Sequence, residues 1–283
     1  MRYESRVRHA LALALLLVGC GHTPSPLQPV RAGSVGSPSH GVLTAPAELP
    51  KEGPGYRWLR DDDHHHALPR FVAAIARAAA RVATERPGEP LRVGDLSTRT
   101  GGRLLPHLSH RTGRDADLLF YLTTLDGAPV ESPGFLSVGT DGLAWDRENR
   151  RYLRFDIERE WLLVKTLLED PEARIQWVFA HRNVEALLVE HARARGESNE
   201  LVARAIDVLL QPQPGGLHDD HVHIRTACTP GEIAAGCEPT GPVRPWIAAL
   251  DPVADAPSDR ELLEAILLPL PERKERLAGD HAR

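Results

Sequence analysis

Residues 106–117 read PHLSHRTGRDAD and residues 218–223 read HDDHVH, and these two stretches decide how the chain is interpreted. Each offers imidazoles and carboxylates at short intervals, and about one hundred residues separate them. Zinc in hydrolytic sites is held by three such side chains and keeps a fourth position open for water. The two stretches together therefore predict a zinc site that supports hydrolysis.

The spacing within each stretch indicates how the side chains meet. His221 and His223 lie on one face of an expected strand, because alternate residues of a strand share a face. One imidazole can then bind the metal while the other faces a substrate beside it. His110 and Asp117 lie seven residues apart, and Gly113 between them disfavours a helix. A loop that enters a strand would bring Asp117 back to the metal.

Neither spacing is specific alone, since the chain has 14 histidines and chance clusters are common. The co-occurrence of both motifs, with Ser109 and Gly113 in place, is the stronger signal. A third histidine-rich run, residues 62–66 with the sequence DDHHH, precedes an expected helix that begins at Pro69. We interpret that run as a solvated loop rather than a metal site.

The segments SHRTGRDAD and HDDHVHIR resemble the motifs of the penicillin-insensitive murein endopeptidases, which belong to a wider zinc group of lysostaphin-type, D-Ala-D-Ala-type and hedgehog-like domains. The resemblance covers roughly residues 90–228. The segment GDLSTRTGGRLLPH is similar to the sequence that precedes the first motif in the family. It implies a zinc ion held by His110, Asp117 and His223, with His221 beside the water as the proton-handling residue. His218 and His107 match two further family histidines, which line the cleft and could hold a second metal.

Some roles stay open. Related branches carry a glutamate near the position of Asp220 as their base, whereas an aspartate next to His221 is similar to the endopeptidase branch. The general base is therefore His221, His218 or Asp220, and Asp219 or Asp220 could instead orient His107 or His218. The family's remaining metal ligands have only Asp156 and His181 as their nearest counterparts. One zinc ion is expected and a second is left open.

The resemblance implies hydrolysis of peptidoglycan cross-links between D-alanine and meso-diaminopimelate, without a serine nucleophile. One alternative is a D,D-carboxypeptidase or dipeptidase, which needs a site closed at one end to hold a free carboxylate, often with an arginine. Arg99, Arg103 and Arg111 are near the first motif. Another is a non-catalytic, cell-wall-binding lipoprotein on the same fold.

The N-terminus has the pattern of a bacterial export signal. Three arginines precede an apolar run, residues 10–18, that is too short to span a bilayer as a helix. The run ends in Leu17-Val18-Gly19-Cys20, which resembles a lipobox. Residues 1–19 are therefore expected to be a signal peptide and Cys20 to be lipidated, with an ordinary signal peptide as the alternative. Gly21 after Cys20 favours anchoring in the outer membrane, facing the periplasm.

Charge and cysteine content agree with an exported protein. The formal net charge of −5 gives no electrostatic footprint for nucleic acid. Cys228 and Cys237 are an even pair for an oxidising compartment, and their spacing lacks the short CxxC clip of structural zinc sites. A disulfide between them is expected.

Residues 20–55 contain seven Pro and six Gly and are expected to form a disordered tether. Residues 56–251 are the expected zinc peptidase domain, and residues 252–283 a peripheral helix and charged tail. Hydrophobic periodicity predicts helices near 69–86, 157–170, 183–195 and 199–210, with strands near 91–97, 115–122, 152–155, 175–179 and 221–225. Residues 124–150 read as a hairpin or long loop. This irregular order predicts an α+β fold, a small, mainly antiparallel sheet flanked by helices, similar to hedgehog and D-Ala-D-Ala-peptidase domains.

Overall fold

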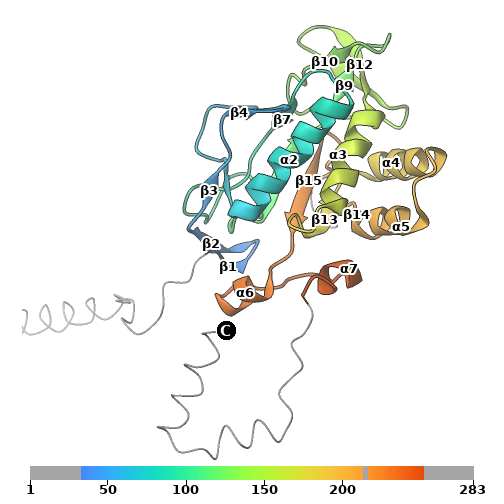
Figure 1. The fold of residues 1–283 in the computed structure, drawn as a ribbon. Helices are drawn as coiled ribbons and strands as arrows, with labels where there is room; N and C mark the ends of the chain where they lie inside the picture. The colour runs from blue at the N-terminus through green and yellow to red at the C-terminus, as the bar shows by residue number, and fades with distance from the viewer. Residues whose placement is uncertain (1–32, 213–215, 252–283) are drawn as a thin grey trace, which may run out of the picture.

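The computed structural model describes residues 33–212 and 216–251, and its central feature is a seven-stranded mixed sheet (Figure 1). In spatial order the strands are β14 (Leu209–Leu210), β13 (Ile175–Phe179), β15 (His221–Thr226), β8 (Asp115–Leu119), β7 (Leu91–Val93), β5 (Tyr56–Trp58) and β4 (Glu52–Gly53). Only the β13–β14 and β5–β7 pairs are parallel. The α+β class and the mainly antiparallel sheet are confirmed.

The two motif strands are neighbours in the middle of this sheet. Strands β8 and β15 pair antiparallel, so that His223 lies opposite Asp117 and Arg225 lies opposite Asp115. Directly opposed residues of an antiparallel pair have Cα atoms about 4.5–5.5 Å apart. This register brings together side chains that are more than one hundred positions apart in the sequence.

Helices cover one face of the sheet and leave the motif side chains on the other. Val222 and Ile224 of β15 are fully buried in the same core as the apolar faces of the helices. Because strand residues alternate, His221, His223 and Arg225 point away from that core. The helices are α2 (Pro69–Glu85), α3 (Ile157–Glu169), α4 (Arg182–Ala194) and α5 (Asn199–Val208).

The predicted helix boundaries agree with the local chemistry. Helix α2 has Pro69 in its first turn, where the missing N–H costs nothing. The side chain of Asp156 accepts a hydrogen bond from the backbone N–H of Arg159 and so caps α3, which ends before Pro171. Residues 209–210, expected at the end of the last helix, instead form β14 at the edge of the sheet.

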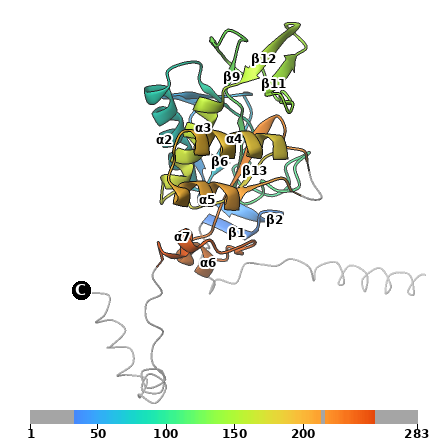
Figure 2. The ribbon, with the colours of Figure 1, turned by 90° about the vertical axis from the view of Figure 1, so that its right-hand side faces the viewer.

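A second, four-stranded antiparallel sheet projects from the top of the molecule (Figures 1 and 2). It contains, in spatial order, β10 (Pro129–Val130), β9 (Leu122–Thr123), β12 (Arg151–Phe155) and β11 (Leu143–Asp146). Residues 124–150, expected to be a hairpin or long loop, instead supply β10 and β11, which pair with β9 and β12 on either side of this range and form the two edges of the sheet.

The N-terminal boundary of the folded domain was predicted wrongly. Residues 33–55 are not a tether, because they form β1 (Gly33–Ser37), β2 (His40–Thr44), β3 (Ala47–Glu48) and β4. Strands β1 and β2 form a hairpin, and β3 pairs with β6 (His66–Ala67). Leu43 and Leu49 lie in the main core. The glycines and prolines within residues 33–55 belong to short strands and the turns between them.

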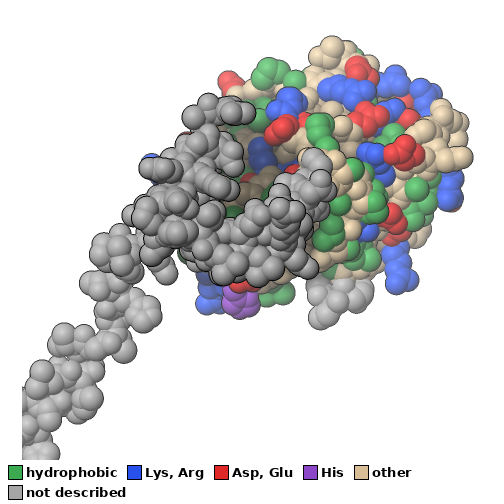
Figure 3. All heavy atoms as spheres, turned by 60° about the horizontal axis from the view of Figure 1, so that its bottom comes forward, with side chains coloured by type: hydrophobic (Ala, Val, Ile, Leu, Met, Phe, Trp, Pro, Cys, Tyr) green, Lys and Arg blue, Asp and Glu red, His purple; other side chains and the backbone are tan. Residues whose placement is uncertain are grey.

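The other terminal predictions, namely the signal peptide, Cys20, residues 20–32 of the tether and the tail at 252–283, lie outside the described residues. Within the described residues, no helix combines the length and the apolar character needed to cross a bilayer. Figure 3 shows the face that carries α6 (Pro230–Ala234) and α7 (Pro245–Ala248). Where that face is visible, acidic and basic side chains are interspersed, and no large patch of one sign is seen.

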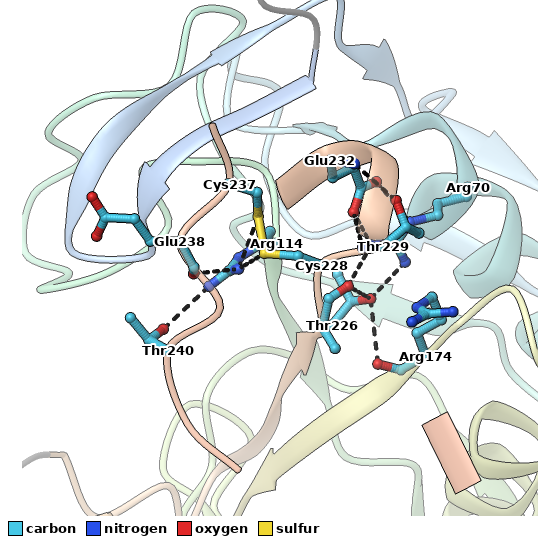
Figure 4. Close-up of a disulfide and its surroundings, with 11 residues drawn as sticks. Arg70, Arg114, Arg174, Thr226, Cys228, Thr229, Glu232, Cys237, Glu238 and Thr240 are labelled. Carbon is cyan, nitrogen blue, oxygen red and sulfur yellow. Dashed lines mark hydrogen bonds and ion pairs between the residues drawn. A yellow bond between two sulfur atoms is a disulfide. The ribbon is translucent and has the colours of Figure 1, made fainter. Parts of the chain in front are cut away.

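The predicted disulfide between Cys228 and Cys237 is present. It packs against the buried guanidinium of Arg114, the residue directly before β8 (Figure 4). Arg114 Nη1 donates to the Sγ of Cys237 at 3.1 Å and to the backbone oxygen of Glu238 at 3.0 Å. Burial lowers the pKa of Arg114 to about 10, so the group is still a cation at neutral pH. The disulfide loop is thereby attached to the strand that carries Asp115 and Asp117.

Candidate metal centre and active site

The carboxylate of Asp117 lies at the centre of the site and is fully buried. Its Oδ1 is 3.3 Å from His110 Nε2, 3.2 Å from His223 Nδ1 and 3.4 Å from His221 Nε2. Neither carboxylate oxygen has a hydrogen-bond partner among the described residues, and neither does His110 Nε2. Unpaired polar atoms in a protein interior are costly unless a partner or a cation satisfies them.

Two imidazoles are fixed so that a lone pair faces Asp117. His110 Nδ1–H donates to the backbone oxygen of Leu96 at 2.6 Å, and His223 Nε2–H donates to Asp115 Oδ1 at 2.8 Å. Because a carbonyl or carboxylate oxygen only accepts, the opposite nitrogen of each ring is left unprotonated in the neutral imidazole. This is the arrangement in which outer partners hold metal-binding histidines.

Two of the separations between the donor atoms match those around a tetrahedral zinc ion. Two ligand atoms about 2.0–2.1 Å from such an ion lie about 3.3–3.4 Å apart. The separations from Asp117 Oδ1 to His110 Nε2 and to His223 Nδ1 are 3.3 and 3.2 Å. Two imidazoles and one carboxylate are also a donor set that zinc accepts. The polar atoms without hydrogen-bond partners, the orientation of the two rings and these distances are all compatible with a bound zinc ion.

His221 is set apart from the other histidines by its partner. Its Nδ1 lies 2.6 Å from Asp220 Oδ1, so that Nε2 faces Asp117. Burial acts to lower the pKa of His221, but the carboxylates of Asp117 and Asp220 outweigh it and raise the pKa to about 10. An imidazole held by a carboxylate in this way is oriented for proton transfer.

His218 and His107 lie beside the same centre, with their rings close to those of His223 and His110. His218 Nδ1–H donates to the backbone oxygen of Gly216 at 2.8 Å, and burial together with His223 and His221 lowers its pKa to about 4. His107 Nε2 lies 2.8 Å from Asp95, and its Nδ1 lies 3.7 Å from Asp117 Oδ2. The structure thus forms two groups whose donor atoms lie within 4.8 Å of one another, His107–His110–Asp117 and His218–His221–His223.

A cavity of about 580 Å³ opens over these histidines. A volume of this size suits a ligand or a short peptide segment. Its walls combine apolar side chains with the imidazoles and include His107, Leu108, Phe179, His218, Asp220 and His221. All the histidines predicted at the site are therefore beside one accessible hollow, except His110, which is fully buried beneath it.

Several residues that organise the site were not predicted from the sequence. Asp115 holds His223 and also accepts a hydrogen bond from Arg225 Nε at 2.6 Å. Asp95 holds His107. Burial acts to raise the pKa of Asp95, but hydrogen bonds from His107 and Arg60 hold it far below its usual value. Strand alternation would have placed Asp115 on the face of Asp117, whereas Asp95 had no such signal.

Two interpretations need correction. Asp219 and Asp220 orient neither His107 nor His218, because Asp95 and the oxygen of Gly216 take those positions. The run at residues 62–66 is not simply a solvated loop, since His65 is 1% exposed and its ring lies 3.8 Å from that of Trp58.

The possible counterparts of further family ligands lie elsewhere. Asp156 caps α3, and His181 Nδ1 accepts a hydrogen bond from the backbone N–H of Asn183 at the start of α4. Neither residue belongs to a donor group formed by the described residues. A further group, Asp62, His64 and Asp95, contains carboxylates that already pair with Arg60.

Comparisons with known proteins agree with this geometry. The family model described as penicillin-insensitive murein endopeptidase matches residues 34–246, which include every site residue above. A penicillin-insensitive murein endopeptidase of Haemophilus influenzae is 27% identical over 229 residues, covering 78% of this chain and 71% of that protein. Its counterpart in Shigella sonnei is 25% identical over 272 residues, covering 88% and 90%. With a family model that spans most of its length, the chain belongs to the penicillin-insensitive murein endopeptidases.

Proposed function

We propose that this protein is a zinc-dependent endopeptidase that hydrolyses the peptide cross-links of peptidoglycan, at the bond between D-alanine and meso-diaminopimelate. Membership of a murein endopeptidase family supports peptidoglycan as the substrate. The single observation that supports metal-dependent chemistry is the convergence of His110 Nε2 and His223 Nδ1 on the carboxylate of Asp117, whose oxygens have no hydrogen-bond partner among the described residues.

His110, Asp117 and His223 would hold the zinc ion, with Leu96 and Asp115 keeping the two imidazoles in the binding tautomer. A zinc ion bound there would polarise the scissile carbonyl and make hydroxide available near neutral pH. The cavity beside it is lined in part by the apolar side chains of Leu108 and Phe179.

His221 is the residue that we assign to proton transfer. Asp220 fixes its Nδ1, which directs Nε2 toward the reacting centre. A zinc ion on Asp117 would oppose the carboxylates that raise the pKa of His221, so that Nε2 could accept the proton of the attacking water and deliver it to the departing amine of diaminopimelate. His218 is neutral at pH 7 because its pKa is about 4, and its Nε2 can accept a hydrogen bond from a substrate amide.

The family match favours an endopeptidase over a D,D-carboxypeptidase. Carboxypeptidases often use an arginine for the free carboxylate of their substrate. Arg99, Arg103 and Arg111 are not among the described residues that line the cavity, whereas Arg225 lines it with its Nε donating to Asp115.

We further propose that the enzyme acts in the periplasm, with Cys20 as the lipid anchor and the outer membrane as the favoured location. The lipobox-like sequence before Cys20 and the substrate together support this location.

The proposed reaction is tested by incubating the protein with a mixture of cross-linked muropeptide dimers and free pentapeptides, and by resolving the products by mass. We expect the dimers to be converted to monomers while the pentapeptides keep their terminal D-alanine. A chelator should abolish the conversion and added zinc should restore it. Release of D-alanine with intact dimers would establish the carboxypeptidase instead, and full activity after removal of all metal would refute the zinc mechanism.

A further inference from the structure

A second hollow, of about 480 Å³, adjoins the active-site cavity. It lies between the β11–β12 hairpin and the start of α4, which are near each other in Figure 2. Asp219 lines both hollows, and it stands next to Asp220 and two residues before His221. A ligand that fills the active-site cavity can therefore extend over Asp219 into the second hollow.

The wall between the hollows is held by backbone hydrogen bonds. Val138 N–H donates to the backbone oxygen of Asp219 at 2.7 Å, and His181 N–H donates to that of His218 at 2.8 Å. These bonds attach the hairpin side and the α4 side of the second hollow to the segment that carries the active-site histidines. These hydrogen bonds thus hold the two hollows in a fixed position relative to each other.

Two exposed aromatic rings form part of the second hollow. Trp145 of β11 and Tyr152 of β12 lie directly opposite each other, with ring centroids 4.8 Å apart. They are 45% and 54% exposed. A cross-strand aromatic pair contributes roughly 0.2–1 kcal/mol to a hairpin. The pair could stabilise the hairpin equally well at a distance from the active site. A role in binding a ligand, by contrast, requires the rings to lie beside the hollow, as they do here.

The charges around the hollow indicate the class of ligand. Its polar side chains include two carboxylates, Asp141 and Asp219, and the described residues that line it contain no Lys or Arg. A stem peptide rich in carboxylates would be repelled by such a wall. A neutral sugar has hydroxyl and amide N–H donors for the carboxylates and for Asn183, and an apolar ring face for the aromatic side chains.

We infer that this second hollow binds an N-acetylated hexosamine of the glycan strand to which the cleaved stem peptide is attached. The inference rests on the proposed function, because that function supplies a substrate in which sugar and scissile peptide are connected. Trp145 and Tyr152 form the stacking platform, and Asp141 and Asp219 accept hydrogen bonds from the sugar. The enzyme would then recognise a cross-link together with its glycan.

Direct binding tests the subsite without any dependence on cleavage. The probe is a neutral N-acetylglucosamine tetramer, titrated calorimetrically into the protein. We expect the parent protein to bind it and the double variant Trp145→Ala/Tyr152→Ala to bind at least about tenfold more weakly, a difference of about 1.4 kcal/mol. Leu125→Ala is the matched control, since Leu125 is 50% exposed near the same sheet but does not line the hollow. No binding by the parent, or equal binding by the double variant, would overturn the inference.

Cleavage kinetics supply the second readout. For glycan-bearing cross-linked substrate, the double variant should show a raised KM with kcat retained; for cross-linked peptide dimers freed of sugar, its kcat/KM should equal that of the parent. An equal loss on both substrates would contradict a glycan subsite, with thermal melting used to verify that the variant is folded. If the parent cleaves neither substrate, the proposed function fails, while the calorimetric result still decides whether the hollow binds sugar.

Discussion

Replacing His223 by alanine is expected to abolish bound zinc and cross-link cleavage together. The substitution removes the nitrogen 3.2 Å from Asp117 Oδ1 and leaves only His110 and Asp117 of the three proposed ligands. It also removes one partner of Asp115, which keeps Arg225 Nε and the backbone N–H of His110 as hydrogen-bond donors. Loss of an outer partner typically costs 10–100-fold in metal affinity or activity, and loss of a ligand itself should cost more.

The comparison uses zinc stoichiometry by elemental analysis and dimer cleavage on the same samples. His191→Ala is a suitable control, because this histidine is in the last turn of α4 and belongs to neither donor group of the site. The control should keep both zinc and activity. Cleavage by a metal-free His223→Ala protein would contradict the assignment of His223 as a ligand.

Replacing His221 by alanine should have a different effect: activity falls while zinc stays bound. General acid–base catalysis contributes typically 10²–10⁴-fold, and we expect kcat to fall by about this factor. Zinc should remain at the stoichiometry of the parent, because His110, Asp117 and His223 are unchanged. The separation of the two effects is what distinguishes a proton-transfer residue from a metal ligand.

Asp220→Asn is the informative companion of this variant. It leaves the imidazole of His221 in place but removes the charge of the carboxylate 2.6 Å from Nδ1, so its kcat should lie between those of the parent and of His221→Ala. Loss of zinc from His221→Ala would instead make His221 a ligand, and an unchanged kcat would remove it from the mechanism.

The elements around the site could be predicted where their signals are local. Pro69 at the start of α2, Asp156 as the cap of α3 and Pro171 after its end all act within a few residues. The alternation of β15 correctly predicted that His221 and His223 share a face. Such short-range patterns hold because hydrogen bonding and steric limits along the chain determine them.

Other features depend on contacts that the local sequence does not encode. The composition of residues 33–55 suggested a tether, but Leu43 and Leu49 are buried by packing against distant elements. His107 forms a hydrogen bond with Asp95, twelve positions away, and His223 forms one with Asp115 across the strand pair. The aromatic pair of Trp145 and Tyr152 also arises only from the register of β11 with β12.

In the proposed site, three side chains from two distant segments share one zinc ion. A crystal structure of the zinc-loaded protein, with anomalous scattering recorded at the zinc edge, tests this arrangement. We expect one strong peak about 2.0–2.2 Å from His110 Nε2, an Asp117 oxygen and His223 Nδ1. A zinc peak elsewhere in an active protein, with these three atoms not bound to metal, would contradict it.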